Sequence, residues 1–293
     1  MNHPDLAAPG LTADWLNAWL AAIGVTVLVP EARLGWSTDR RPMAWFWVEG
    51  RDLPAKIAEA LPSTDDLGRL SIARSLVGHP DLLRAVPLEV YKDRAAVARH
   101  EGDFSLEATV TDLQGSLPQG GLPHSPFDTP APQGRTLHQR LAHCRSALGA
   151  DLRAEVVASF GGSGRRIAAN GLGFDCRRFA SGVQPDAPKM VDPVVECLAF
   201  FGMALFPARG NGTRPQTRGW QDRASKVGAF RWPAWSAPLD RWAIDALLDR
   251  IPSPRERPGP ARLLGFTSLF ETVPYRPVAT ADTTRAYGSR RVW

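Results

Sequence analysis

The segment from residue 112 to residue 134 limits what this chain can fold into more than any other part of the sequence. Nine of its 23 residues are proline or glycine. Proline removes a backbone donor and glycine costs conformational entropy, so neither a helix nor a strand persists at this density. We therefore predict a loop or linker over 112–134, between an N-terminal α+β region, 1–111, and a basic C-terminal α+β region, 135–293. The two regions could still share one sheet.

Apolar spacing predicts that the N-terminal region opens with a helix over 12–24, because tryptophan and leucine recur there at helical intervals and Gly24 follows them. After Gly24 the apolar runs are shorter and are separated by turn residues, a pattern typical of an antiparallel meander. The further predicted elements are strands at 25–29, 33–36 and 43–48, helices at 53–61 and 66–77, and a strand or helix end at 86–91.

The C-terminal region has one strong helix signal, at Asp192-Pro193. Aspartate caps the helix, proline fits its first turn, and an apolar stripe follows to Leu205. Strands are predicted at 154–160, 229–232 and 265–273, and helices at 136–148 and 239–248. No regular alternation of strand and helix is present, so the predicted fold class is α+β, with small antiparallel sheets packed against helices.

Two segments of the chain resemble each other. Trp19-Leu20-Ala21-Ala22-Ile23-Gly24 and Cys197-Leu198-Ala199-Phe200-Phe201-Gly202 each form an apolar helix that ends at glycine and precedes a short apolar stretch. The pattern raises the hypothesis that the chain contains two similar halves, although apolar helices of this kind also arise by chance.

Charge is distributed unequally along the chain. Residues 1–150 hold 14 Lys+Arg against 17 Asp+Glu, whereas residues 151–293 hold 21 against 13. Nearly all of the excess is arginine, whose planar fork suits phosphate. A GC-rich genome would explain arginine in place of lysine, but it would not explain the asymmetry. The sequence therefore favours a protein that contacts a polyanion through its C-terminal region.

Composition also narrows the compartment. No run of about 18 apolar residues is present, and the first ten residues lack a basic and then apolar leader. The chain has three cysteines, a small and odd number, which argues against a disulfide framework. We therefore expect a cytoplasmic protein without a membrane segment.

The stretch Gly161-Gly162-Ser163-Gly164-Arg165-Arg166 is a candidate phosphate contact. Small residues let backbone N–H groups approach a phosphate, and Arg165 and Arg166 would neutralise it. It lacks the Lys-Ser/Thr of a P-loop and the spacing of a dinucleotide-binding fingerprint, so no nucleotide cofactor is predicted. A plain flexible turn is the alternative interpretation.

The second candidate is the segment 209–235, where cations alternate with tryptophan and Asp222 is the one acid. Cations bind a phosphate backbone with release of counterions, and exposed aromatic rings stack on unpaired bases. Trp232 and Trp235 fit a hydrophobic core better than a binding surface. The predicted nucleic-acid-binding residues here are Arg209, Arg214, Arg218, Trp220, Arg223, Lys226 and Arg231, with the basic C-terminal tail as a weaker third element.

No catalytic or metal-binding constellation is predicted. His138, His143 and Cys144 are badly spaced for ligands on one helix face, and no paired-cysteine motif occurs. Ser163 departs from the nucleophile-elbow pattern. Cys176 has cationic neighbours, but a buried inert thiol is the commoner situation.

Several segments resemble, in order and spacing, proteins encoded beside type I-G (formerly I-U) CRISPR systems. The N-terminal blocks are Trp15–Gly24 and Arg33-Leu34-Gly35-Trp36-Ser37-Thr38-Asp39, and the C-terminal blocks are Asp192–Gly202, Phe230-Arg231-Trp232-Pro233-Ala234-Trp235 and Leu264-Gly265-Phe266. Together these five blocks hold 37 of the 293 residues. The resemblance implies a subunit or accessory protein of an RNA-guided effector complex in antiviral defence, with guide RNA, target DNA and other subunits as partners. It supplies no catalytic residue.

The leading hypothesis is thus a non-catalytic nucleic-acid-binding subunit of such a complex, in which base pairing reads sequence and protein holds the backbones. One alternative is a metal-independent ribonuclease that processes guide precursors through His138, His143 or Tyr275. The other is a scaffold whose basic region binds an acidic protein.

Overall fold

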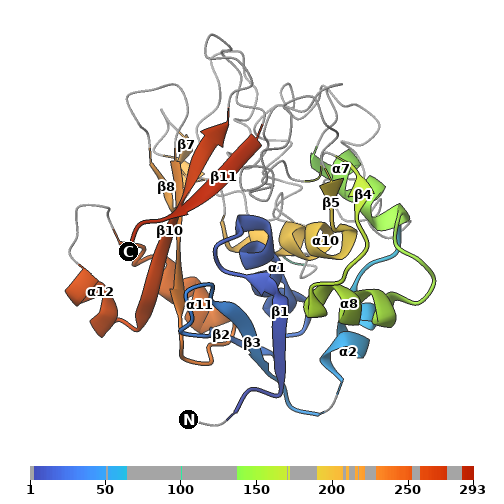
Figure 1. The fold of residues 1–293 in the computed structure, drawn as a ribbon, viewed down its shortest axis with the longest axis horizontal. Helices are drawn as coiled ribbons and strands as arrows, with labels where there is room; N and C mark the ends of the chain where they lie inside the picture. Colours follow the sequence, from blue (N-terminus) through green and yellow to red (C-terminus); the bar gives the residue numbers. More distant parts are fainter. Residues whose placement is uncertain are drawn as a thin grey trace.

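The computed structural model describes residues 3–50, 52–64, 100, 137–169, 171, 190–206, 209–210, 215–216, 218–221, 229–252, 258–275 and 286–293. Figure 1 labels most of the helices and strands in these residues. They are β1 (Leu6–Thr12), α1 (Leu16–Leu28), β2 (Arg33–Trp36), β3 (Met43–Trp47), α2 (Leu53–Ala60), α7 (Leu137–Ser146), α8 (Leu152–Gly161), β4 (Ile167–Ala168), β5 (Met190–Val191), α10 (Pro193–Gly202), the 3-10 helix η2 (Met203–Leu205), β6 (Arg209–Gly210), β7 (Pro215–Gln216), β8 (Trp220–Gln221), β9 (Ala229–Trp235), α11 (Arg241–Leu248), α12 (Pro258–Leu263), β10 (Phe266–Tyr275) and β11 (Ala286–Arg291).

Two antiparallel sheets frame the molecule. The first has the strand order β1-β3-β2 and comes from the N-terminal region; the second has the order β11-β10-β9-β8 and comes from the C-terminal region. A β-bridge connects Leu34, in β2 of the first sheet, with Leu239, which follows β9 of the second. The N–H of each residue donates to the carbonyl of the other. The pairs β4-β5 and β6-β7 are separate two-stranded ladders. Helices packed with small antiparallel sheets confirm the α+β fold class.

The helices α1 and α10 lie side by side in the middle of the molecule, with α7 and α8 beyond α10 (Figure 1). Every residue of α10 is buried, and so is every residue of α1 except its last. A helix that is apolar all round requires neighbours on every side. These two helices therefore form the centre of the core, and they come from opposite sides of the 112–134 segment.

The two helices touch backbone to backbone at Gly24 and Gly202. A Cβ built on Gly24 would lie 1.9 Å from the carbonyl oxygen of Leu198, and one on Gly202 would lie 2.0 Å from that of Leu20. Leu20 and Gly24 are four residues apart, as are Leu198 and Gly202, so the contact is reciprocal. These are the positions that the sequence similarity aligns. The helices therefore cross with local two-fold symmetry.

Aromatic rings complete the core around Trp19. Its ring lies 5.7 Å from that of Phe206 and 6.4 Å from that of Trp232. The indole N–H groups of the buried tryptophans donate across the chain: Trp19 to Pro233 O at 2.8 Å, and Trp235 to Leu34 O at 2.9 Å. Trp232 and Trp235 are fully buried, which confirms their assignment to the core. Residues on both sides of 112–134 share this single core.

Most predicted elements are present. Strands at 33–36, 43–48 and 265–273 correspond to β2, β3 and β10, and helices at 53–61, 136–148 and 239–248 correspond to α2, α7 and α11. The cap at Asp192 is confirmed, because its carboxylate accepts from the backbone N–H groups of Val194 and Val195. The predictions at 66–77, 86–91 and 112–134 lie outside the described residues.

Two predicted strands are helical. Residues 25–28 continue α1, because packing on α10 outweighs the β propensity of valine. Residues 154–160 belong to α8, which starts where the Asp151 carboxylate accepts from Ala154 N at 2.9 Å. Seven observed strands were not predicted. Two are long: β1, whose Ala-Pro-Gly composition disguises it, and β11, in the polar tail. The other five, β4 to β8, are two residues long each.

Candidate nucleic-acid interface

The glycine-rich turn after α8 is a helix C-cap. Gly162 adopts a left-handed conformation with φ of 86°, and its N–H donates to Ser159 O at 3.1 Å. The N–H of Ser163 donates to Ala158 O at 2.9 Å. These donors satisfy the last carbonyls of α8, as C-caps do. They are therefore not free to cradle a phosphate, and the cradle interpretation of this turn is corrected.

Close packing explains Gly164 of the turn and Gly10 of β1, which faces the turn. A Cβ on Gly164 would lie 2.1 Å from a carboxylate oxygen of Asp192, and one on Gly10 would lie 2.0 Å from Ser159 O. The turn thus lets β1, α8 and the start of α10 approach each other. Gly162 and Gly164 are explained by structure without a ligand, whereas a Cβ on Gly161 would meet only Ser163 Oγ at 4.0 Å.

The two arginines at the end of this turn remain at the surface. Arg165 has half of its side chain exposed and pairs with Glu155, with 3.1 Å between Nη2 and Oε1. It also donates to the carbonyl of Ala147. Arg166 is exposed and makes no ion pair with a carboxylate among the described residues. Arg166 is therefore the cation of this turn that is most open to a phosphate.

Arg218 is held inside the protein. Its side chain is 11% exposed, its Nε donates to Leu205 O at 2.7 Å, and its guanidinium pairs with both Asp245 and Asp249 on and after α11. The guanidinium carbon also lies 5.5 Å from the centre of the Phe206 ring. Two carboxylates, the Leu205 carbonyl and the Phe206 ring surround this guanidinium, so the expected phosphate contact at Arg218 is corrected.

Arg231 is buried in the second sheet. Its residue is 4% exposed, and its Nε lies 3.0 Å from Oε2 of Glu271, the residue that faces it on β10. Glu271 also accepts from Arg290 of β11, on the other side. The three side chains form a row across β9, β10 and β11. Arg231 has no surface from which to reach a nucleic acid, and its assignment is corrected as well.

The exposed tryptophan of the C-terminal region is Trp242, which the sequence analysis did not single out, and not Trp220. Trp220 is partly buried and packs on Phe230, with ring centres 5.5 Å apart. Trp242, on α11, is 66% exposed, and the guanidinium of Arg241 stacks over it at 4.1 Å. The sequence offered no signal for Trp242, since an amphipathic helix conceals one outward-facing tryptophan.

The remaining predicted residues are described in part or not at all. For Arg209 the structure describes the backbone, which pairs with Gln216 in the β6-β7 ladder. Arg214, Arg223 and Lys226 lie outside the described residues. Their predicted phosphate contacts stay predictions.

Four arginines from the two ends of the chain form a surface that the sequence did not predict. We call it the basic edge; it consists of Arg40, Arg41, Arg290 and Arg291. Arg291, in the edge strand β11, donates to the carbonyl of Arg40 at 3.3 Å across 251 positions of sequence. Arg41 and Arg290 have 66% and 61% of their side chains exposed.

Buried polar groups between the central helices have structural roles. The Asn17 amide donates to the carboxylate of Glu196, and Ser159 Oγ donates to Asp192 at 2.9 Å. Burial raises the pKa of the Cys144 and Cys197 thiols, so neither has the thiolate that nucleophilic chemistry needs. Cys176 and the side chain of Tyr275 lie outside what the structure describes.

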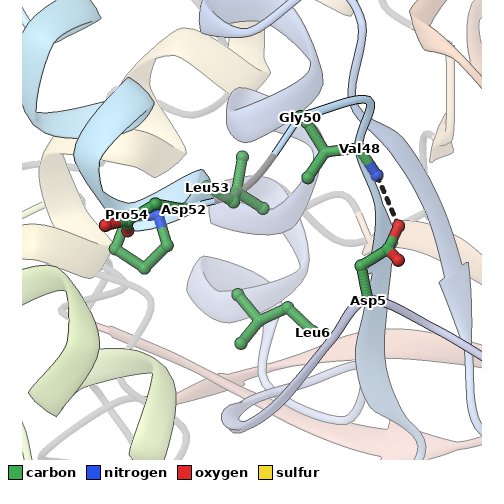
Figure 2. Close-up of a pocket in the computed structure, with 7 residues that line it drawn as sticks. All are labelled: Asp5, Leu6, Val48, Gly50, Asp52, Leu53 and Pro54. Carbon is green, nitrogen blue, oxygen red and sulfur yellow. Dashed lines mark hydrogen bonds between the residues drawn. The ribbon is translucent and has the colours of Figure 1, made fainter.

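One pocket of about 440 Å³ lies between the start of β1, the end of β3 and the start of α2 (Figure 2). Its carboxylates are occupied: Asp5 accepts from Val48 N at 3.0 Å, and Asp52 caps α2 and pairs with Arg153 at 2.7 Å. The Arg153 hydrogen bond holds the pKa of Asp52 below its usual value. An acidic rim over Leu6, Leu53 and Pro54 repels phosphate, so this pocket has no part in the candidate interface.

Comparison with known proteins finds no match. No family model, no curated protein and no solved structure matches the chain. Within the described ranges, no group of three His, Cys, Asp or Glu side chains is placed to hold a metal ion. In the same ranges, no helix has the length and apolar character needed to span a bilayer.

Proposed function

We propose that this chain is a non-catalytic nucleic-acid-binding subunit of a type I CRISPR RNA-guided DNA-targeting complex. The observation that carries the proposal is the charge asymmetry, with 21 cations against 13 acids in residues 151–293. Arginine supplies nearly all of these cations, and it binds phosphate through paired hydrogen bonds. The assignment to a CRISPR complex rests on the sequence resemblance of five short segments.

The geometry changes which residues carry the proposal. Arg165 and Arg166 stay in it, because both are exposed at the end of one turn. Arg209, Arg214, Arg223 and Lys226 stay in it on their sequence pattern alone. Arg218 leaves it because its own side chain is largely buried and pairs with Asp245 and Asp249, and Arg231 leaves it because it pairs with the buried Glu271.

The proposal assigns the reading of sequence to the guide RNA and the holding of the phosphate backbone to this protein. Other effector subunits would bind its remaining surfaces, and cleavage would belong to a separate nuclease. The cytoplasm is the compartment in which guide RNA, target DNA and these subunits meet, so it is the location that we propose.

Binding to labelled single-stranded RNA and labelled duplex DNA tests the proposal. We expect affinity to fall steeply between about 50 and about 200 mM salt, because each neutralised phosphate releases counterions. Arg165→Gln with Arg166→Gln should reduce the slope of log affinity against log salt by about 2. Arg153→Gln, on the same helix α8 but paired with Asp52, serves as the control. Salt-insensitive binding, or none, would refute the proposal.

The same RNA distinguishes the ribonuclease alternative. After incubation with the protein in chelator, RNA that carries a CRISPR repeat should remain intact if the protein only binds it. Site-specific cleavage would instead favour the enzyme. His143 is exposed at the end of α7, and the side chains of His138 and Tyr275 lie outside what the structure describes, so this assay decides between the two functions.

A further inference from the structure

The basic edge has more positive charge than its own carboxylates neutralise. Arg41 pairs with Asp14 at 2.9 Å, which cancels one charge. Arg40 makes no ion pair with a carboxylate in the residues that the structure describes, and Arg291 donates only to oxygens of Arg40, Ser268 and Trp293. Arg40 therefore leaves one positive charge without a carboxylate partner, whereas Arg291 contacts an oxygen of Trp293 at the end of the sequence, with 3.1 Å between Nε and O.

The row of side chains Arg231–Glu271–Arg290 adds a further positive charge. One buried carboxylate faces two guanidinium groups, 3.0 Å from that of Arg231, and the row carries a net charge of one. Arg290 is the exposed end of this row, so the excess charge emerges at the surface. Asp39, exposed beside Arg40, is the one opposing charge in the loop 38–41. The basic edge thus keeps a net positive charge after every described acid is counted.

The shape of this surface is linear. β11 is the outermost strand of its sheet, and successive side chains in a strand point to opposite faces. Arg290 therefore points to the face that holds Glu271, whereas Arg291 points toward Arg40 and the loop 38–41. Exposed arginines thus lie on both faces of the C-terminal end of β11, and they form a strip instead of a closed pocket.

We propose that the basic edge binds the phosphate backbone of a nucleic acid, which follows β11 and contacts Arg40 and Arg291 on one side and Arg290 on the other. This inference rests on the proposed function and assigns it a second contact site, away from the turn at Arg165 and Arg166. A linear polyanion fits a linear strip, and exposed guanidinium groups make paired hydrogen bonds to phosphate.

An edge strand also carries charged residues simply to prevent pairing with other sheets. That role needs charge of either sign and no partner. The excess of positive charge is what distinguishes the two roles, and it makes a direct test possible. Charge on a protective edge can be removed without any effect on binding to RNA or DNA.

The test compares two double variants of the full chain. Arg40→Gln with Arg291→Gln removes two positive charges of the basic edge, and the slope of log affinity against log salt should fall by about 2. Arg33→Gln with Arg153→Gln removes two exposed arginines elsewhere and should leave the slope unchanged. Arg40→Gln alone, at a side chain without an ion pair, should reduce the slope by about 1 and guards against misfolding of the double variant.

The outcomes separate this inference from the proposed function. If the unmodified protein binds neither RNA nor DNA, both are refuted. If it binds and the basic-edge variant binds with the same salt slope, the inference is refuted and the proposed function stands. A third outcome would overturn the inference in favour of an acidic protein as the partner of the basic edge. In it, poly-glutamate displaces RNA from the unmodified protein but not from the basic-edge variant, while both proteins bind RNA with the same slope of log affinity against log salt.

Discussion

Replacement of Gly202 by alanine tests the backbone contact between α1 and α10. The new Cβ would lie 2.0 Å from the Leu20 carbonyl oxygen, 2.8 Å from its carbon and 3.1 Å from Gly24 N. All three are backbone atoms inside a buried helix, so no side-chain rotation relieves the clash. Since carbon contacts become favourable at about 3.5 Å, the helices must separate by more than about 1 Å.

The cost follows from the packing around the contact. Overpacking in a core costs about 1 to 3 kcal/mol, and here it displaces two helices that are buried on every side. Alanine recovers about 1 kcal/mol through its higher helix propensity. Because the clash is with backbone atoms, we take the upper end of the overpacking range, about 3 kcal/mol, and expect Gly202→Ala to lower the free energy of unfolding by about 2 kcal/mol. Urea unfolding followed by tryptophan fluorescence measures it, because Trp19 lies in the same core.

Two further variants make the test specific. Gly24→Ala should cost a similar amount, and the double variant should cost less than the sum, because one separation of the helices relieves both clashes. Gly161→Ala, in the last turn of α8, meets only Ser163 Oγ at 4.0 Å and should not destabilise the protein. Equal stability of Gly202→Ala and the unmodified protein would refute the close crossing.

Three other predictions follow from burial and charge. Arg231→Ala should lower the free energy of unfolding by about 3 kcal/mol, because it removes a charged partner from the buried Glu271 carboxylate, whereas Arg153→Ala at the surface should cost less than about 1 kcal/mol in the same urea assay. Burial raises the pKa of the Asp192 carboxyl, so the folded protein binds the proton more tightly than the unfolded one, and stability relative to Asp192→Asn should decline as pH rises from below the unfolded pKa through the folded pKa. A pH-independent difference between the two would contradict this. Trp242→Phe should remove most of the tryptophan fluorescence that iodide quenches, while urea unfolding stays within about 0.5 kcal/mol.

Local signals in the sequence predicted the elements that local chemistry determines. The cap at Asp192 and the apolar stripe after it specify α10 without help from the rest of the chain. The strands β2 and β3 follow from their aromatic residues and the turn between them. By contrast, 25–28 is helical because α10 packs against it, and no window of local sequence contains α10.

The candidate interface was harder to predict because ion pairs in this fold join distant residues. The sequence placed six cations against one acid in 209–231. In the structure, Arg218 meets Asp245 and Arg231 meets Glu271, acids that lie outside that segment. The same distance concealed the basic edge, since nothing local relates Arg40 to Arg291. Net charge along the sequence located the basic region but not its exposed members.

The reciprocal contact of Gly24 and Gly202 has the geometry of an isologous interface, in which residue i of one unit meets residue j of the other and the reverse. The likeness continues along the chain. Each glycine is followed by paired strands that end at a tryptophan, Trp47 or Trp235, five residues before a helix-capping aspartate. In a homodimer of identical subunits, one codon would set both glycines and both surfaces would carry equal charge. Covalent linkage removes that constraint, so one half of this chain is free to be acidic while the other is basic.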